Sequence, residues 1–401
     1  MSQRVFITGV GIITSIGKNT AENLDSLLNR HHGFGTLELL DTVHKASFPC
    51  CEIKLDDAQL KIMAGAEGPG FTRTTLLGLI ALKEAVRSAG LSETELKTCG
   101  LISATTTGGI REFEKNFYDI LNPDQYGVFE QFTDTANPGE HCERMADTLG
   151  IRRYVSTVST ACSSSANAMM QGAALIKSGK MARVICGGTE ALSRFTINGF
   201  NALMILDSEH CRPFDQTRKG LNLGEGAAYL VLESESSMVS RAKHPLAILS
   251  GYGNANDAFH QTSSSPEGTG AFKAMTAALN SAGISAEAVQ YINAHGTATE
   301  NNDLSEGTGL KRVFGENIPP FSSTKPFTGH TLAAAGSIEA VYSLMAIQKS
   351  IVWPSLNFHH TIPELNIVPQ TELQTVSEIK NVLSNSFGFG GNTSSLLMTA
   401  V

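Results

Sequence analysis

Long apolar runs are missing from this sequence, and charged and aromatic residues are few. The 401 residues include 17% charged and 7% aromatic residues, with a single tryptophan. A membrane-spanning helix needs a run of about 18 or more apolar residues, so we expect no membrane span. The net charge of -8 argues against general nucleic-acid binding. An acidic partner would therefore need a local basic patch.

Paired cysteines at metal-binding spacing are also missing. The sequence has no C-x-x-C pattern among its seven cysteines, which are Cys50, Cys51, Cys99, Cys142, Cys162, Cys186 and Cys211. An odd count without such spacing favours neither a disulfide framework nor a zinc site, so we expect a reducing, cytoplasmic setting. Polar and glycine residues interrupt the apolar stretch over residues 5–16, which predicts a buried strand and turn rather than a signal peptide.

Cys162 stands between a strand pattern and a helix pattern. Residues 155–158 favour an extended chain, and the small residues of 164–174 favour a closely packed helix. A thiol at a helix N-terminus faces free backbone N–H groups and the positive end of the helix dipole, and both favour the nucleophilic thiolate. Cys162 is therefore a candidate nucleophile. A buried structural cysteine is the alternative.

Strand patterns and helix patterns alternate along the chain. The first half has strand patterns at 5–11, 100–104, 155–158, 181–187 and 227–233, and helix patterns at 20–29, 72–89, 110–121 and 139–149. A strand entering glycine recurs at 247–254, and an extended run followed by a loop and a small-residue helix recurs at 321–348. This similarity predicts a duplicated, layered α/β fold whose central helices lie between two sheets, with a boundary near 240–246.

Two histidines and a glycine-rich segment stand where loops are expected. His295 follows a strand pattern and His330 precedes a helix pattern. Histidine is suited to proton transfer near neutral pH, although a hydrogen-bonded structural histidine is the alternative for each. No cysteine or carboxylate lies at customary ligand spacing around them, so we expect no metal site. The glycines of 388–391 let backbone N–H groups approach a ligand, and a tight hairpin is the alternative.

Together these segments resemble a known family. Thr160-Ala-Cys-Ser-Ser, Asn293-Ala-His-Gly-Thr-Ala-Thr, Lys325-Pro-Phe-Thr-Gly-His and Asn385-Ser-Phe-Gly-Phe-Gly-Gly occur in that order. The chain resembles the elongating β-ketoacyl-acyl-carrier-protein synthases of the thiolase-like superfamily. The resemblance implies a duplicated five-layer α-β-α-β-α fold with two central helices between mixed sheets. Residues 1–243 would form the half that carries Cys162, and residues 244–401 the half that carries both histidines.

The resemblance implies a decarboxylative Claisen condensation. An acyl group on Cys162 would be extended by two carbons from malonyl-acyl-carrier-protein, to make fatty acid, polyene or polyketide chains. His295 and His330 would promote decarboxylation, while Lys325 and Glu339 would set protonation and geometry. Without the resemblance, Lys325 and Glu339 would be interpreted as surface residues. No metal or redox cofactor is implied, because the phosphopantetheine arm arrives on the carrier protein.

The resemblance also implies roles around the reacting atoms. The backbone N–H groups of Cys162 and Phe389 would stabilise an oxyanion, and the Phe389 ring would act as a gate. Thr297 and Thr299 would hold the pantetheine arm. Thr107, Phe200 and Leu221 would line the acyl pocket. The basic residues that we expect at the carrier-protein docking surface are Arg73, Arg111, Lys115 and Arg194.

Two departures from the family pattern bear on these expectations. Asn392-Thr393 replaces the usual Thr-Asn order, and Thr107 replaces an aliphatic residue. The threonine predicts shorter, unsaturated or partly polar acyl groups. A thiolase acting on coenzyme A thioesters is one alternative, but its second cysteine is missing from 387–391. A silent partner subunit that sets chain length is another, but such subunits usually lack the cysteine. We expect a homodimer or a heterodimer with a related partner.

Overall fold

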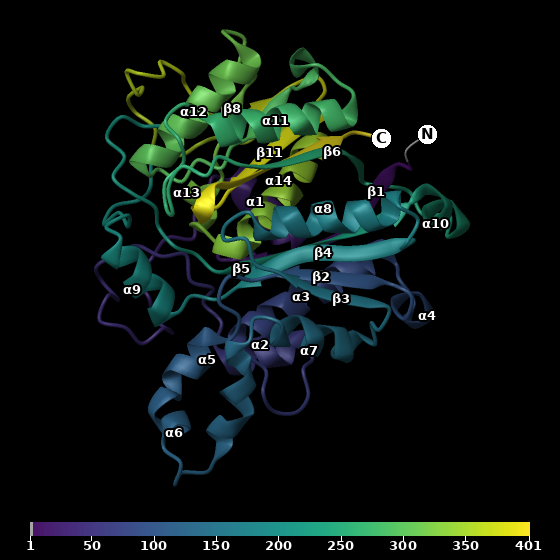
Figure 1. Ribbon diagram of the computed structural model, residues 1–401, viewed down its shortest axis with the longest axis vertical. Helices are drawn as coiled ribbons and strands as arrows, with labels where there is room; N and C mark the ends of the chain where they lie inside the picture. Colours follow the sequence, from purple (N-terminus) through teal and green to yellow (C-terminus); the bar gives the residue numbers. More distant parts are fainter. Residues whose placement is uncertain (1–2) are drawn as a thin grey trace.

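The strands of the first half lie side by side in the order β3-β2-β4-β5-β1. Their bounds are β1 (Val5–Thr14), β2 (Gly100–Ala104), β3 (Tyr154–Val158), β4 (Arg183–Glu190) and β5 (Gly226–Ser234). Strand β2 pairs in parallel with β3 and β4, whereas β5 pairs antiparallel with β4 and β1. The computed structural model describes residues 3–401, and Figure 1 shows β2, β3 and β4 below helix α8 (Ser164–Lys177).

The strands of the second half repeat this arrangement as β8-β7-β11-β12-β6. Their bounds are β6 (Ala247–Asn256), β7 (Tyr291–Asn293), β8 (Phe321–Ser322), β11 (Asn381–Phe387) and β12 (Asn392–Thr399), and a separate ribbon pairs β9 (Ile351–Val352) with β10 (Gln374–Thr375). Strand β7 again pairs in parallel with both neighbours, and β12 pairs antiparallel with both of its own. The shared order and directions confirm the duplicated α/β fold.

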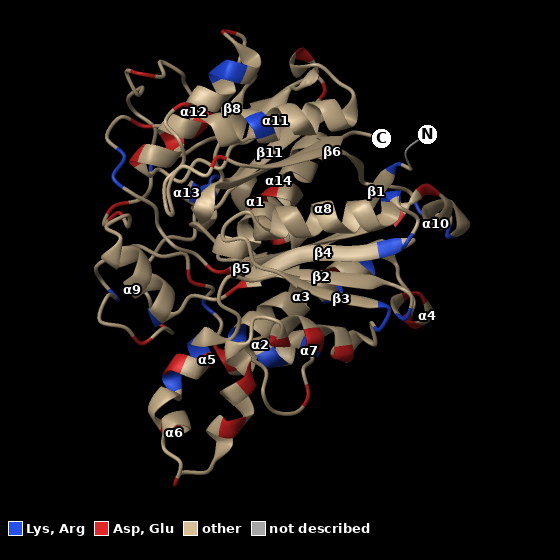
Figure 2. Ribbon diagram, viewed as in Figure 1, with Lys and Arg blue, Asp and Glu red and all other residues tan. Residues whose placement is uncertain are grey.

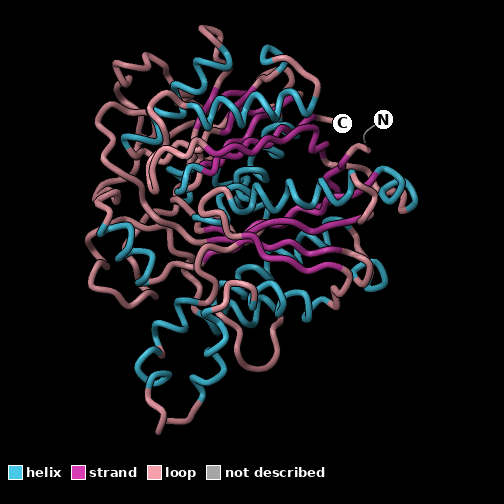
Figure 3. The backbone as a smooth tube through the Cα atoms, in the orientation of Figure 1, coloured by secondary structure: helices cyan, strands magenta, loops and turns pink. Residues whose placement is uncertain are grey.

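The two expected layers of strands are joined at one point. The two sets of strands do not form separate sheets, because Phe6 and Ile7 of β1 pair with Ile248 and Ala247 of β6. This short contact joins them into one ten-stranded sheet. The join is narrow, so the sheet still divides into two layers with helices between them, as Figure 3 shows. The boundary between residues 243 and 244 stays a prediction.

The remaining helices fill or cover these layers. Their bounds are α1 (Thr20–Leu28), α2 (Asp57–Ala64), α3 (Arg73–Ala89), α4 (Glu93–Leu96), α5 (Ile110–Lys115), α6 (Phe117–Leu121), α7 (Glu140–Leu149), α9 (Arg194–Ala202), α10 (Glu235–Ser240), α11 (Thr269–Ala282), α12 (Glu300–Phe314), α13 (Lys325–Thr328) and α14 (Ala335–Lys349). Helices α8 and α14 lie between the strand layers, α3 and α7 lie outside the first-half strands, and α11 and α12 lie outside the second-half strands (Figure 1).

The two central helices pack closely because small residues face their neighbours. A Cβ atom on Gly336 of α14 would lie 2.9 Å from the Ala166 backbone nitrogen of α8. A Cβ on Gly172 of α8 would lie 2.2 Å from Cys186 Sγ of β4. Contacts this short are not tolerated in a close-packed interior. The small-residue patterns of these two helices therefore bring the two halves of the chain into contact.

The helix expected over 110–121 is broken. Asn116 ends α5, and its side-chain amide donates to the Glu112 carbonyl oxygen at 2.7 Å, which competes with continued helix formation. The expected helix over 72–89 is confirmed, with Thr72 as N-cap and Gly90 as C-cap at φ 67°. Among the described residues, no helix has both the length and the apolar character needed to span a membrane.

Candidate active site

The thiol, the two histidines and the aromatic gate predicted from the sequence meet at one cavity. The cavity has a volume of about 370 Å³, and Cys162, His295, His330 and Phe389 all line it. Cys162 comes from the turn between β3 and α8, His295 from the loop after β7, and His330 from the loop after α13. Residues that are 168 positions apart in the sequence (162 and 330) are thus brought together at the ends of the central helices.

Cys162 lies in a strained turn just before helix α8. Ala161 has φ 52°, in the left-handed region that L-residues rarely adopt. Ser163 is the N-cap of α8, so Cys162 precedes the helix rather than belonging to it. Its side chain is buried, with 5% of the residue exposed. The turn therefore presents one sulfur atom to the cavity from a fixed backbone.

Burial raises the pKa of the Cys162 thiol to about 12, and the carboxylates of Glu190 and Glu339 act in the same direction. The Lys325 charge and the Phe389 backbone N–H lower this pKa but do not offset the burial. Burial therefore opposes the thiolate that the helix N-terminus is expected to favour, because a charged sulfur loses its hydration there.

This pKa predicts how Cys162 reacts with iodoacetamide. Because only the thiolate reacts, the alkylation rate should rise about tenfold per pH unit between pH 7 and pH 9, without a plateau. Mass spectrometry of the Cys162 peptide after timed labelling measures the rate. The unfolded protein is the control, since its Cys162 should level off near the ordinary value of about 8.5. A plateau below pH 8 in the folded protein would contradict the raised pKa.

His295 is held by a buried carboxylate from α12. The Glu306 side chain accepts hydrogen bonds from the backbone N–H groups of His295 at 2.9 Å and of Gly296 at 2.8 Å. Asn385 of β11 donates to the same carboxylate at 3.0 Å. Burial raises the pKa of Glu306 to about 7. Sequence reasoning missed Glu306, because nothing in the spacing of a helical glutamate shows that it turns toward a loop.

The Nδ1 atom of the His295 ring accepts a hydrogen bond from Lys325. Lys325 Nζ donates to His295 Nδ1 at 3.2 Å and also to the His295 carbonyl oxygen. The same Nζ donates to Glu339 Oε1 at 2.5 Å. Lys325 and Glu339 are each only 2% exposed, so their interpretation as surface residues is wrong. Burial raises the pKa of Glu339 to about 7, against the lowering effect of Lys325.

The Nδ1 atom of the His330 ring also accepts a hydrogen bond. The Leu332 backbone N–H donates to the ring nitrogen His330 Nδ1 at 3.2 Å, and the backbone N–H of His330 donates to the Asn222 carbonyl oxygen at 2.7 Å. Since Nδ1 accepts in both His295 and His330, each neutral ring carries its proton on Nε2. The two rings lie edge to face with centroids 5.3 Å apart. The pair therefore presents two Nε2–H donors to the cavity.

Both histidines are held in the neutral form. Burial lowers the pKa of His295 well below its usual value, and the charge of Lys325 and the nearness of the second imidazole of His330 lower it further. Burial also lowers the pKa of His330 well below its usual value, and the charge of Lys325 adds to this effect. Neutral Nε2–H groups can donate hydrogen bonds to developing negative charge on an oxygen atom. Within residues 3–401 no three metal-ligating side chains gather, and the absence of a metal site stays a prediction.

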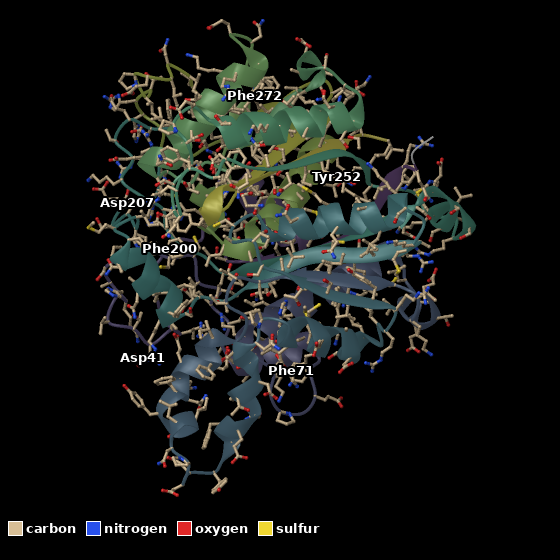
Figure 4. The ribbon with its side chains drawn as sticks, viewed as in Figure 1. Asp41, Phe71, Phe200, Asp207, Tyr252 and Phe272 are labelled. Atoms are coloured by element: carbon tan, nitrogen blue, oxygen red, sulfur yellow. The ribbon has the colours of Figure 1, made fainter. Side chains whose placement is uncertain are left out.

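The glycine-rich loop lies against the nucleophile turn. A Cβ on Gly388 would lie 2.8 Å from the Thr160 carbonyl oxygen and 3.2 Å from the Cys162 nitrogen. The Phe389 ring stacks on Phe200 of α9 with centroids 5.8 Å apart, and Figure 4 labels Phe200 beside that helix. The loop also connects β11 to β12, so the hairpin alternative describes the same segment.

Comparison with known proteins gives the family. The model of the β-ketoacyl synthase N-terminal domain matches residues 2–237, and that of the C-terminal domain matches residues 246–359. The chain belongs to the β-ketoacyl synthase family. The resemblance seen in the sequence is confirmed, and the thiolase-like fold with it.

Curated relatives of the synthase match nearly the whole chain. The 3-oxoacyl-[acyl-carrier-protein] synthase 2 of Staphylococcus aureus strain COL is 34% identical, over 99% of this chain and 98% of the relative. The protein of the same name from Synechocystis sp. is 33% identical, over 98% of this chain and 97% of the relative. These matches confirm that the chain is a ketosynthase-type enzyme.

Solved ketosynthase structures superimpose on the chain. The ishigamide ketosynthase/chain length factor has a TM-score of 0.92 at 28% identity, and each chain is covered completely. The ketosynthase ApeO in complex with its chain length factor ApeC, from Xenorhabdus doucetiae, has a TM-score of 0.87 at 30% identity, covering 100% of this chain and 98% of the other. The fold around the cavity is therefore that of ketosynthases.

The predicted substrate-binding residues of this synthase divide into two groups. Thr297, Thr299, Phe200 and Leu221 line the cavity. Thr107 does not, because its hydroxyl donates to the buried Glu190 carboxylate at 3.0 Å and its backbone N–H donates to the same group at 3.3 Å. The contact of Thr107 with an acyl chain stays a prediction. Sequence reasoning missed Glu190, which also accepts from the Thr106 N–H at 2.7 Å.

The predicted docking residues are largely engaged elsewhere. Arg73 is completely buried and pairs with Glu225, with Nη2 2.6 Å from Oε1, so its assignment to a docking surface is wrong. Arg111 donates to the Leu192 carbonyl oxygen, and Arg194 pairs with Glu114 at 3.7 Å. Lys115 is exposed. Figure 2 shows basic residues scattered over this view rather than gathered in one patch.

Proposed function

We propose that the chain catalyses the decarboxylative condensation of a malonyl thioester with an acyl group on Cys162. The observation that carries this proposal is the meeting of one thiol and two Nε2–H donors at a single cavity. A carbanion equivalent cannot form freely in water, so its oxygen must receive hydrogen bonds from groups already in place. Cys162 holds the electrophile, and the histidines stabilise the nucleophile.

The first step loads the acyl group. Cys162 Sγ attacks the thioester carbonyl carbon, and the carbonyl electron pair moves to oxygen, where the backbone N–H groups of Cys162 and Phe389 donate to it. The carbon–sulfur bond to the carrier then breaks, and the departing carrier thiolate takes up the proton that Cys162 gives up. Because the pKa of the free thiol is raised to about 12, this proton leaves only as the new bond forms.

The second step makes the new carbon–carbon bond. The bond between the malonyl carboxylate and its α-carbon breaks, carbon dioxide leaves, and the electron pair forms an enolate. The enolate oxygen accepts from His295 Nε2–H and His330 Nε2–H. The α-carbon attacks the acyl carbon, the bond to Cys162 breaks, and the sulfur takes up a proton from water. Lys325 and Glu339 act by keeping His295 Nδ1 an acceptor.

The substrates are proposed to be thioesters of a phosphopantetheine arm carried by an acyl carrier protein. The curated relatives carry that carrier in their name, and Thr297 and Thr299 line the cavity beside the reacting residues. Among the described residues that line this cavity, Cys162 is the one cysteine, which favours a synthase over a thiolase. Retention of Cys162 and both histidines favours an active subunit over a silent partner.

The proposal extends to the location of the enzyme, its oligomeric state and its products. All seven cysteines lie unpaired and buried, which supports a reducing, cytoplasmic location. Solved neighbours include a ketosynthase in complex with a chain length factor, which supports a dimer with a second copy or a related partner. The proposed products are fatty acid, polyene or polyketide chains, with shorter, unsaturated or partly polar acyl groups favoured on Cys162.

The experiment that tests the function follows the acyl group. The protein is incubated with an acyl-carrier-protein thioester, and the mass of the Cys162 peptide is measured by mass spectrometry. Malonyl-carrier-protein is then added. We expect acyl mass on Cys162, followed by its loss together with release of carbon dioxide and formation of a β-ketoacyl-carrier product. Failure of Cys162 to acylate would support the silent partner. Equal turnover with acetyl-coenzyme A in place of the malonyl donor would support the thiolase.

Lys219 gives a prediction about carrier-borne substrates. It is the one lysine or arginine among the described residues that line the cavity, its side chain is exposed, and no ion pair holds it. A cation at a cavity mouth attracts the phosphodiester of the arm and the acidic carrier. We expect Lys219→Ala to raise KM for malonyl-carrier-protein about threefold to tenfold at low salt, with kcat nearly unchanged.

Steady-state kinetics at two salt concentrations measure this effect of Lys219. Malonyl-pantetheine, which has no phosphate, should show no change in KM on substitution. Lys97→Ala is the matched control, since Lys97 is also exposed and follows α4, on the side of the molecule opposite α9 in Figure 2. An equal rise in KM for both substrates would contradict a role in binding the phosphate or the carrier.

A further inference from the structure

The side chain of Asn392 is the centre of a polar cluster beside the active site. Its amide oxygen accepts from Ser163 Oγ at 2.7 Å, from Asn167 Nδ2 at 2.9 Å and from Asn254 Nδ2 at 3.0 Å. These donors come from three places, namely the N-cap of α8, its first turns and strand β6. One acceptor atom thus joins segments from both halves of the chain.

The cluster spans the two backbone segments that would form the oxyanion site. Ser163 directly follows Cys162, and its single hydroxyl proton is shared between Asn392 Oδ1 and the Thr160 carbonyl oxygen, which both lie 2.7 Å from Ser163 Oγ. Asn167 Nδ2 also donates to Thr160 Oγ1 at 2.8 Å. On the other side, the Asn392 carbonyl oxygen accepts from the Gly388 N–H at 2.8 Å and so closes the loop that contains Phe389. The nucleophile turn and the glycine-rich loop are therefore tied together at Asn392.

This connection matters because the reaction is sensitive to small displacements. Oxyanion donors must lie about 2.7–3.1 Å from the developing charge, and a shift of about 1 Å can lower a rate about 100-fold. Gly390 and Gly391 have φ of 82° and 80°, so the loop backbone itself contains residues with wide conformational freedom. A loop with two such glycines needs side-chain contacts to hold one position.

We propose that Asn392, with Ser163, Asn167 and Asn254, is a positioning cluster that holds the Phe389 N–H at Cys162. The proposal rests on the proposed function of Cys162 and explains the reversed Asn392-Thr393 order in this chain. Asn392 reaches the nucleophile turn, whereas Thr393 turns away and donates to the Ala255 carbonyl oxygen at 3.0 Å. Asn167 of α8 and Asn254 of β6 donate to the asparagine that stands where the family usually has threonine.

The test compares two reactions of the same thiol. Acyl transfer to Cys162 needs the oxyanion donors, whereas alkylation by iodoacetamide displaces iodide from a saturated carbon and forms no oxyanion. In Asn392→Ala, we expect the acyl-transfer rate to fall about 10- to 100-fold. Alkylation of Cys162 should stay within about twofold of the unchanged protein. Both rates are read from the mass of the Cys162 peptide.

Two further variants complete the test. Ser250→Ala is the matched control, because Ser250 of the same sheet hydrogen-bonds to the Leu397 carbonyl oxygen at 3.1 Å and to Thr399 Oγ1 at 2.7 Å, away from the cluster and the nucleophile turn. It should change neither rate by more than about twofold. The double variant Asn167→Ala/Asn392→Ala should lose little more than Asn392→Ala alone, since residues of one cluster are not additive.

The outcomes separate this proposal from the proposed function. Acyl transfer at the unchanged rate in Asn392→Ala would overturn the positioning cluster. So would an equal fall in both reactions, because that result means that the thiol itself has moved. If the unchanged protein never acylates on Cys162, the proposed function fails instead, whatever the variants do.

Discussion

Replacement of Cys162 by alanine is expected to abolish condensation and leave malonyl decarboxylation in place. Loss of a covalent nucleophile typically lowers turnover by about 10⁴-fold or more. The histidine pair does not touch the sulfur in the hydrogen-bond network, since His295 is held by Lys325 and His330 by the Leu332 N–H. Product formation is followed by chromatography, and carbon dioxide release from malonyl-carrier-protein is followed separately.

The control for Cys162→Ala removes the same sulfur from a different buried site. Cys99 is completely buried beside Arg183, whose Nη1 lies 3.9 Å from its sulfur, and it is not among the residues that line the cavity. Cys99→Ala should therefore keep both condensation and decarboxylation. Continued β-ketoacyl product from Cys162→Ala would contradict its assignment as the acyl carrier. Loss of decarboxylation together with condensation would indicate that the variant has lost the geometry of the whole site.

Replacement of His330 by alanine is expected to have the second largest effect, and on the opposite step. One of the two Nε2–H donors to the enolate oxygen is lost, and removal of one such donor typically lowers a rate about 10²- to 10³-fold. Acylation of Cys162 needs only the backbone donors, so it should persist. Single-turnover assays separate the steps, with acyl mass on Cys162 measured first and carbon dioxide release second.

One rescue variant and one control variant test the interpretation of His330→Ala. His330→Gln places an amide N–H near the position of the lost Nε2–H and should recover part of the decarboxylation rate. His244→Ala removes an exposed histidine that does not line the cavity and should change neither step. A loss of acylation equal to the loss of decarboxylation in His330→Ala would contradict the separate roles of the thiol and the histidine pair.

Local patterns predicted the elements that carry the site. The strand over 100–104 and the helix capped by Thr72 and Gly90 lie where the sequence indicated, because caps and apolar spacing act within a few residues. The predicted single helix over 110–121 is interrupted at Asn116, because the Asn116 side chain donates to the Glu112 carbonyl oxygen. The single joined sheet was not predictable either, because the pairing of β1 with β6 involves only two residues on each strand.

The order of the motifs, and the residue types within them, were determined by the sequence alone, and they identified Cys162, His295, His330 and Phe389 as candidates. Only the tertiary structure decided the protonation of these groups. The neutral histidines, their Nε2–H donors and the raised pKa of Cys162 all depend on burial and on Lys325, Glu339 and Leu332. Burial and hydrogen bonding depend on which distant segments come into contact, and no local pattern of the chain contains that information.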